Sequence, residues 1–178
     1  LGKSNESITN IQIADDGKSI FASLSQLGQI QGTPSVATTR MIAVDVASSK
    51  IRWSAPTTYV GMAPMVLLDE NLLLGGGPNY FDRYSVTDGK LLERKGAHKG
   101  PVHALGMNKA GQLISAGADG ALVTWRDGEP ASRELPHSGS RTALTFNKDR
   151  THWLTAGNDL VIRSWPLNAM RTATIQKI

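Results

Sequence analysis

Short apolar segments alternate with polar residues along the whole chain, and residues typical of tight turns separate them. Alternation over four to eight residues, bounded by Gly and Asp, predicts β-strands, and Asp-Gly pairs favour hairpins. No stretch has a convincing 3.6-residue helical period. Within residues 98–135 the pattern predicts four short antiparallel strands, at 102–107, 112–116, 121–126 and 132–135.

This pattern repeats with a period near forty residues. Ser115, Ala116-Gly117, Asp119 and Trp125 recur forty positions later as Thr155, Ala156-Gly157, Asp159 and Trp165, and His98 recurs as His137. Fainter copies precede them, marked by Tyr84 and by Ile8, Ile11 and Ile13. We therefore expect four repeats, at about 6–56, 60–95, 98–135 and 137–178. Four-stranded antiparallel sheets at this spacing are typical of β-propeller blades.

The third and fourth repeats resemble WD-repeat blades. Such blades carry a His near the first strand, a Ser or Thr on the second, an Asp in the next turn and a Trp on the third. Both sets are complete, and we call them the tetrads: His98, Ser115, Asp119 and Trp125, then His137, Thr155, Asp159 and Trp165. The sequence departs from the family after each Trp, where Arg126 and Pro166 replace Asp.

The residue types of a tetrad suit a hydrogen-bonded structural chain. A buried indole N–H needs an acceptor, a hydroxyl can accept and donate at once, and a carboxylate can accept from an imidazole. His98, Ser115 and Asp119 are also the residue types of a nucleophilic triad. Because the same trio recurs on the next repeat, and no Gly-x-Ser-x-Gly motif is present, we interpret both sets as structural.

The first repeat resembles the docking motif of quinoprotein-like propellers, Ala-x-Asp-x-x-x-Gly-Lys-x-x-Trp. It reads Ala43, Asp45, Lys50 and Trp53, with Ser49 in the place of Gly. The resemblance implies a turn between the two outer strands and a Trp that packs on the neighbouring blade. A partial copy ends at Asp88-Gly89-Lys90. We find no residue set for quinone or metal binding, so we expect no cofactor.

Four repeats are few for the WD type of ring, which usually has seven or eight blades. A seven-blade ring at this period needs about 280 residues, and the chain has 178. We expect a propeller segment of a larger seven- or eight-blade ring, completed by the rest of a longer polypeptide or by another chain. Pairing of two copies and a closed four-blade ring are the alternatives.

The connection 25–40 in the first repeat is much longer than its equivalents, and we expect an insertion there that serves partner binding. A flexible excursion without function is the alternative interpretation. Tyr and Arg in inter-blade loops are further interface candidates. The candidate partner-binding residues are Gln29, Gln31, Arg40, Tyr59, Tyr80, Lys99 and Arg141.

Charge and composition narrow the function classes. Residues 1–89 hold 6 basic and 8 acidic side chains, and residues 90–178 hold 13 and 7, which together give the net charge of +4. The densest basic stretch, 90–99, lacks aromatic interleaving, so we interpret it as a solvated strand edge and do not expect nucleic-acid binding. The chain has no Cys, which excludes disulfides and a Cys nucleophile. The His spacing predicts no metal site, and no apolar run approaches the roughly 18 residues of a membrane helix. Cytoplasm and periplasm both stay open.

We therefore predict an all-β propeller segment that is a non-enzymatic WD-repeat-type scaffold for protein–protein interaction, with no catalytic residues. The expected partner is a protein that completes the propeller, or a multi-subunit complex. The alternative is a quinoprotein-like or hydrolytic propeller enzyme whose active residues lie in blades outside this chain.

Overall fold

The structure is a computed structural model in which the described residues form strands, turns and loops, with no helix among them. It describes residues 6–30, 33–57, 59, 64–68, 71–74, 79–96, 98–107, 111–135, 137, 142–149, 151–166 and 174–177. The strands form four separate four-stranded sheets, each with neighbouring strands in chain order. The prediction of four-stranded antiparallel sheets is confirmed.

The chain divides into two compact units. The N-terminal unit comprises residues 1–77 and 81–95, and the C-terminal unit comprises 78–80 and 96–178. The first sheet contains β1 (Glu6–Ile13), β2 (Ser19–Ile30), β3 (Thr33–Asp45) and β4 (Lys50–Thr57). The second contains β5 (Met65–Leu68), β6 (Asn71–Leu74), β7 (Tyr80–Ser85) and β8 (Leu91–Gly96).

The C-terminal unit holds the two sheets that carry the tetrads. The third sheet contains β9 (Val102–Met107), β10 (Leu113–Gly117), β11 (Leu122–Arg126) and β12 (Glu129–Glu134). The fourth contains β13 (Thr142–Phe146), β14 (His152–Gly157), β15 (Val161–Pro166) and β16 (Thr174–Lys177). The tight turns of the third sheet have glycine where the backbone requires it. Gly120 and Gly128 adopt positive φ angles, which glycine tolerates best.

Aliphatic side chains of the third sheet pack against aromatic side chains of the fourth. Ile114, Ala116 and Leu122 form one hydrophobic core with Trp153 and Trp165. Phe146 lies against Trp153 with ring centroids 3.9 Å apart. Ile114 and Ala116 alternate with Ser115 along β10, so the period-two pattern directs Ser115 to the opposite face of this strand.

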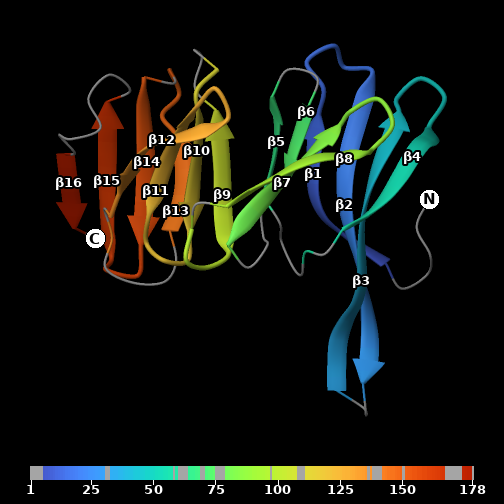
Figure 1. Cartoon of the computed structure of the whole chain (residues 1–178), viewed down its shortest axis with the longest axis horizontal. Helices are drawn as coiled ribbons and strands as arrows, with labels where there is room; N and C mark the ends of the chain where they lie inside the picture. The colour runs from blue at the N-terminus through green and yellow to red at the C-terminus, as the bar shows by residue number, and fades with distance from the viewer. Residues whose placement is uncertain are drawn as a thin grey trace. The chain divides into compact units, whose positions relative to one another are not determined.

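The prediction of a loop at 25–40 was wrong. Residues 25–30 and 33–40 extend β2 and β3 into a long hairpin whose backbone pairing runs from Ser19–Asp45 to Ile30–Thr33. Figure 1 shows this hairpin reaching well past its neighbours in the first sheet. Its Gly, Pro, Ser and Thr residues resembled a loop in the sequence, yet the backbone pairing of the two strands does not require apolar alternation.

Candidate functional site

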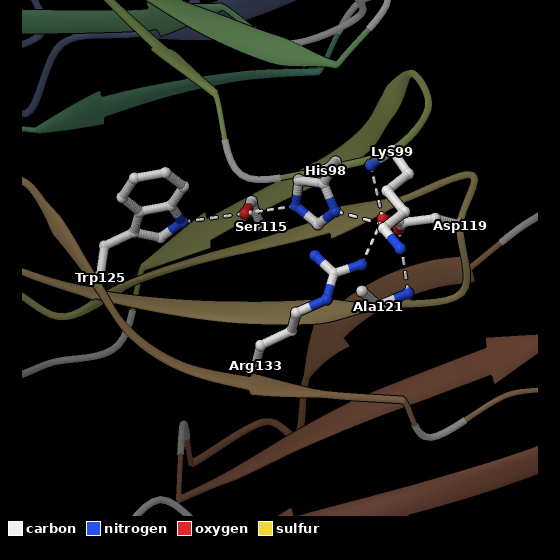
Figure 2. Close-up of polar contacts among 7 residues, drawn as sticks. All are labelled: His98, Lys99, Ser115, Asp119, Ala121, Trp125 and Arg133. Carbon is white, nitrogen blue, oxygen red and sulfur yellow. Dashed lines mark hydrogen bonds and ion pairs between the residues drawn. The ribbon is translucent and has the colours of Figure 1, made fainter.

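Four side chains of the third sheet form one continuous hydrogen-bonded chain. Trp125 Nε1 donates to Ser115 Oγ at 2.9 Å, and Ser115 Oγ lies 2.8 Å from His98 Nε2. His98 Nδ1 lies 3.1 Å from Asp119 Oδ1. Figure 2 shows the chain running from β11 across β10 to the turn that follows it. The tetrad residues, up to 27 positions apart in sequence, thus meet within one sheet.

The position of each proton in this series of hydrogen bonds follows from the groups at its two ends. The indole can only donate and an ionised carboxylate can only accept. Ser115 therefore accepts from Trp125 and donates to His98 Nε2, which leaves the Nδ1 proton of His98 for Asp119. Burial lowers the pKa of His98, and the hydrogen bond that it donates to Asp119 only partly opposes this. His98 is accordingly neutral at pH 7, as this direction of donation requires.

Asp119 collects donors from three other groups. Its carboxylate accepts from the Lys99 amide at 2.7 Å, the Ala121 amide at 3.1 Å and Arg133 Nη2 at 2.6 Å. Burial acts to raise the pKa of Asp119, but hydrogen bonds from Lys99, Arg133 and His98 together hold it well below its usual range. The carboxylate thereby ties the segment before β9, the β10–β11 turn and β12 together.

The fourth sheet repeats the arrangement with Thr in place of Ser. Trp165 Nε1 donates to Thr155 Oγ1 at 2.9 Å, and Thr155 Oγ1 lies 2.9 Å from His137 Nε2. His137 Nδ1 lies 2.9 Å from Asp159 Oδ1. The hydrogen bond with His137, followed by that with Arg163 Nη1 at 2.8 Å, lowers the pKa of Asp159 to about 2.

Two glycines make room for the imidazoles. A Cβ added to Gly117 would overlap His98 Nδ1, and one added to Gly157 would lie 2.6 Å from His137 Cγ. Real Cβ atoms do not approach that closely, so only glycine lets each ring lie on the end of its strand. The repeated Ala-Gly pair was visible in the sequence, but its role was not assigned from the sequence.

The first two sheets replace the tetrad with bidentate ion pairs that sequence reasoning missed. Arg40 on β3 donates to both carboxylate oxygens of Glu6 on β1, at 2.7 and 2.8 Å. Arg94 on β8 does the same with Asp82 on β7, at 2.8 and 2.9 Å, and Asp82 is fully buried. A buried carboxylate needs such a partner, so each pair fixes the register of its strands. An acidic residue between the aromatic residues of a strand, as Asp82 between Phe81 and Tyr84, was the available signal.

Trp53 joins the first sheet to the second within the N-terminal unit. Its Nε1 donates to the carbonyl of Val86 at 2.9 Å, in the turn between β7 and β8. The ring lies directly over Gly89, where an added Cβ would be 2.6 Å from Trp53 Cε3. Ser49 adopts a φ of 55°, the conformation for which the resembling motif carries Gly. The Trp therefore packs on the neighbouring sheet, as the docking motif implies.

The predicted partner-binding residues do not form one exposed cluster. Tyr59 is buried at 1% exposure, because it packs inside the unit instead of projecting from an inter-blade loop, and this corrects its assignment as a docking residue. Arg40 is held by Glu6, and Tyr80 is half-buried at the start of β7. The Lys99 side chain is exposed while its amide binds Asp119. Gln29 lies in β2 with its backbone paired to Pro34, and its side chain, together with Gln31 and Arg141, lies outside the described residues.

The basic stretch 90–99 is partly neutralised by acidic neighbours on its own sheet. Lys95 pairs with Glu93 at 2.8 Å, and Arg83 also approaches Glu93 at 3.2 Å. With Arg94 held by Asp82, these cations offer little free charge to a phosphate backbone. Among the described residues there is no cluster of His, Asp and Glu that could hold a metal ion.

One open cleft of about 350 Å³ lies beside the third sheet's tetrad. Its opposite charges, on Arg126 and Asp127, give no clear preference for an anion or a cation. The lining residues of the cleft are Gly111, Gln112, Trp125, Arg126 and Asp127.

Within the part of the chain that the structure describes, no helix is long and apolar enough to cross a membrane.

Comparison with known proteins connects the fold with WD-repeat proteins. No model of a known protein family matches the chain. It is 36% identical over 87 residues to the F-box-like/WD repeat-containing protein TBL1X of Mus musculus, which covers 47% of this chain and 16% of that protein. The human TBL1X is 34% identical over 84 residues, covering 45% of this chain and 14% of that protein. The chain thus spans a small part of these relatives.

Solved structures match nearly the whole chain. A chain of the mitotic checkpoint complex matches 98% of it with a TM-score of 0.71 and 17% identity. The U3-55K structure matches 99% with a TM-score of 0.74 and 17% identity, and the C-terminal WD40 domain of Sif2 matches all of it with a TM-score of 0.69 and 18% identity. The chain covers 53%, 53% and 60% of these chains. The fold of this chain is therefore that of a β-propeller segment of the WD40 type.

Proposed function

We propose that the chain is a non-enzymatic WD-repeat-type scaffold that holds protein partners in a larger assembly, with blades at 6–56, 60–95, 98–135 and 137–178. The observation that carries the proposal is that the triad-like residues are already engaged in structural hydrogen bonds. Ser115 is fully buried and its hydroxyl is engaged on both sides, by Trp125 and by His98. A nucleophile needs access to substrate, and this hydroxyl has none.

The relatives support the same proposal. WD-repeat proteins are generally non-enzymatic scaffolds, and one of the matching structures is a chain of the mitotic checkpoint complex. A propeller segment offers a rigid framework whose loops and strand edges are free to vary. We extend this role to the chain as protein binding, without transferring the partners of any relative.

An apolar face of the first sheet supports a partner that completes the propeller. Ile8, Ile11 and Ile13 on the edge strand β1 are 66%, 55% and 54% exposed. Their pairing partners on β2 are Leu24, Ala22 and Ile20, so all six side chains lie on one face. Three neighbouring isoleucines exposed to this degree mark an interaction surface. We propose that a further blade, from another chain or a multi-subunit complex, packs on this face.

The test measures whether partner binding depends on that face. The protein is isolated from its native source under mild conditions, and the complex mass is measured by light scattering. We expect a stoichiometric protein partner that Ile11→Lys releases and that Val46→Lys retains, because Val46 is an exposed turn residue that receives the same charge. A hydrolytic activity of the isolated chain that Ser115→Ala abolishes would overturn the proposal in favour of an enzyme.

A further inference from the structure

The fourth sheet has a second face, turned away from the third sheet. Trp153 and Trp165 pair across β14 and β15, and both belong to the core shared with the third sheet. Because side chains alternate along a strand, Leu154 and Ala156 point to the opposite face, where Ile162 lies beside its pairing partner Ala156. We call this set the outer face; its residues are Ala143, Leu154, Ala156 and Ile162.

The outer face repeats the pattern of a face that is buried in the third sheet. The residues forty positions earlier are Ile114 for Leu154, Ala116 for Ala156 and Leu122 for Ile162. The strand register is repeated as well, because Ala116 pairs with Leu122 across β10 and β11. The two faces differ in burial. The three third-sheet side chains are fully buried, whereas Ile162 is 36% exposed and Leu154 and Ala156 are half-buried.

Aromatic side chains cover this pattern of residues in the third sheet. Trp153 on β14 and Phe146 on β13 pack in one core with the aliphatic residues of β10 and β11. Gly106 on β9 leaves room for them, since an added Cβ would lie 3.1 Å from Trp153 Cζ3 and 3.3 Å from Phe146 Cε2. The contact between the third and fourth sheets therefore indicates which side chains such a face accepts: the rings of the next blade.

The outer face differs from the third-sheet face at one position. Thr145 on β13 stands where the third sheet has Gly106, as the strand registers show. The exposed Thr145 side chain occupies the place that Gly106 leaves open, so a ring lies less deeply over β13 than Trp153 lies over β9. We therefore expect the ring of a partner over β14 and β15, above the small Ala156 and beside Ile162.

We propose that the outer face of the fourth sheet binds a further blade, which lays an aromatic side chain of its second strand on Ala156 and Ile162. The described aromatic residues of the first sheet, Phe21 and Trp53, are buried and lie against each other, and Trp53 also packs on the second sheet. A second copy of this chain would thus offer isoleucines and no ring. The inference rests on the proposed function, and it adds a second docking face and the chemistry of its occupant.

Thiol labelling tests whether the outer face is covered, because the chain has no Cys of its own. Ile162→Cys places one thiol on the outer face, and Val46→Cys, the matched control, places one on an exposed turn. Each variant is labelled with a maleimide, both as the isolated chain and within the assembly purified from its native source. We expect Ile162→Cys to react about tenfold more slowly or less in the assembly, and Val46→Cys to react equally in both. Equal reaction of Ile162→Cys in both overturns the inference.

Photo-cross-linking identifies the occupant of the outer face. Ile162 is replaced by p-benzoylphenylalanine in the native source, the assembly is irradiated, and the attached peptide is sequenced by mass spectrometry. We expect a peptide from outside residues 1–178, attached beside an aromatic residue. Attachment to a second copy of this chain, attachment away from any aromatic residue, or no attachment overturns the inference. Release of a partner through Ile11→Lys concerns the first sheet and is measured separately, so either proposal can fail alone.

Discussion

Removing one hydroxyl from the third sheet tests whether the tetrad stabilises the fold. Ser115→Ala leaves two buried groups without their partner, the indole N–H of Trp125 and the Nε2 of His98. Each stranded group costs about 1–3 kcal/mol, so we expect a loss of roughly 3 kcal/mol in the free energy of unfolding. Ser132→Ala removes a hydroxyl from the same sheet, where it lies 2.7 Å from Thr124 Oγ1, its one partner among the described side chains. That loss should be about 1 kcal/mol.

The assay is urea unfolding of both variants, followed by circular dichroism and by Trp fluorescence. Trp125, Trp153 and Trp165 report on the C-terminal unit and Trp53 on the N-terminal unit, so the two probes also reveal whether the units unfold together. The variants should differ by about 2 kcal/mol, or roughly 5 °C in Tm. Ser115→Thr should restore stability, since the fourth sheet uses Thr155 in this position. A difference below about 0.5 kcal/mol would refute the structural role of the tetrad.

Four further changes have defined outcomes. Leu160, exposed and at a φ of 56°, replaces the Gly120 of the preceding sheet, so Leu160→Gly should raise the unfolding free energy by about 1 kcal/mol in a urea titration. Gly89→Ala should lower Tm and alter the fluorescence of Trp53, because the new Cβ would meet its ring; unchanged spectra would contradict this packing. The lowered pKa of His98 means that the unfolded chain takes up a proton more readily, so stability should fall as pH drops below about 6.5; that slope should disappear in His98→Gln. Trp153 Nε1 is buried with no hydrogen-bond partner among the described residues, so Trp153→Phe should destabilise less than Trp165→Phe in parallel melts.

The tetrads could be found in the sequence because their residues recur at a fixed period. Repetition marks Ser115 and Thr155 as equivalent without any knowledge of their contacts. The Arg94–Asp82 and Arg40–Glu6 pairs have no such signal, because their partners lie on different strands and meet only through the strand register. In the first sheet that register includes a shift in β1 between Ile8 and Asn10, which no local pattern announces.

The extended hairpin and the burial of Tyr59 are features that the sequence pattern did not predict. Gly28, Pro34 and the Ser and Thr residues of the hairpin are typical of loops, yet backbone pairing alone makes strands of them. Tyr59 follows β4 and was expected on a docking loop, but its side chain is only 1% exposed. In the hairpin the decisive contacts are pairings between strands, and periodicity over a short window does not contain them.

Apolar packing alone would leave the strands of each sheet free to slip in register. All four sheets meet the same requirement with polar contacts between their strands. The N-terminal unit meets it with Arg–carboxylate pairs, and the C-terminal unit meets it with His–Asp contacts that Arg133 and Arg163 reinforce. An Arg–carboxylate pair holds until the carboxylate is protonated, whereas burial lowers the pKa of His98 and makes its protonation costly from about pH 6.5 downward. The two units should therefore differ in acid sensitivity. The C-terminal unit should loosen first, because it contains His98, whose protonation the folded state opposes.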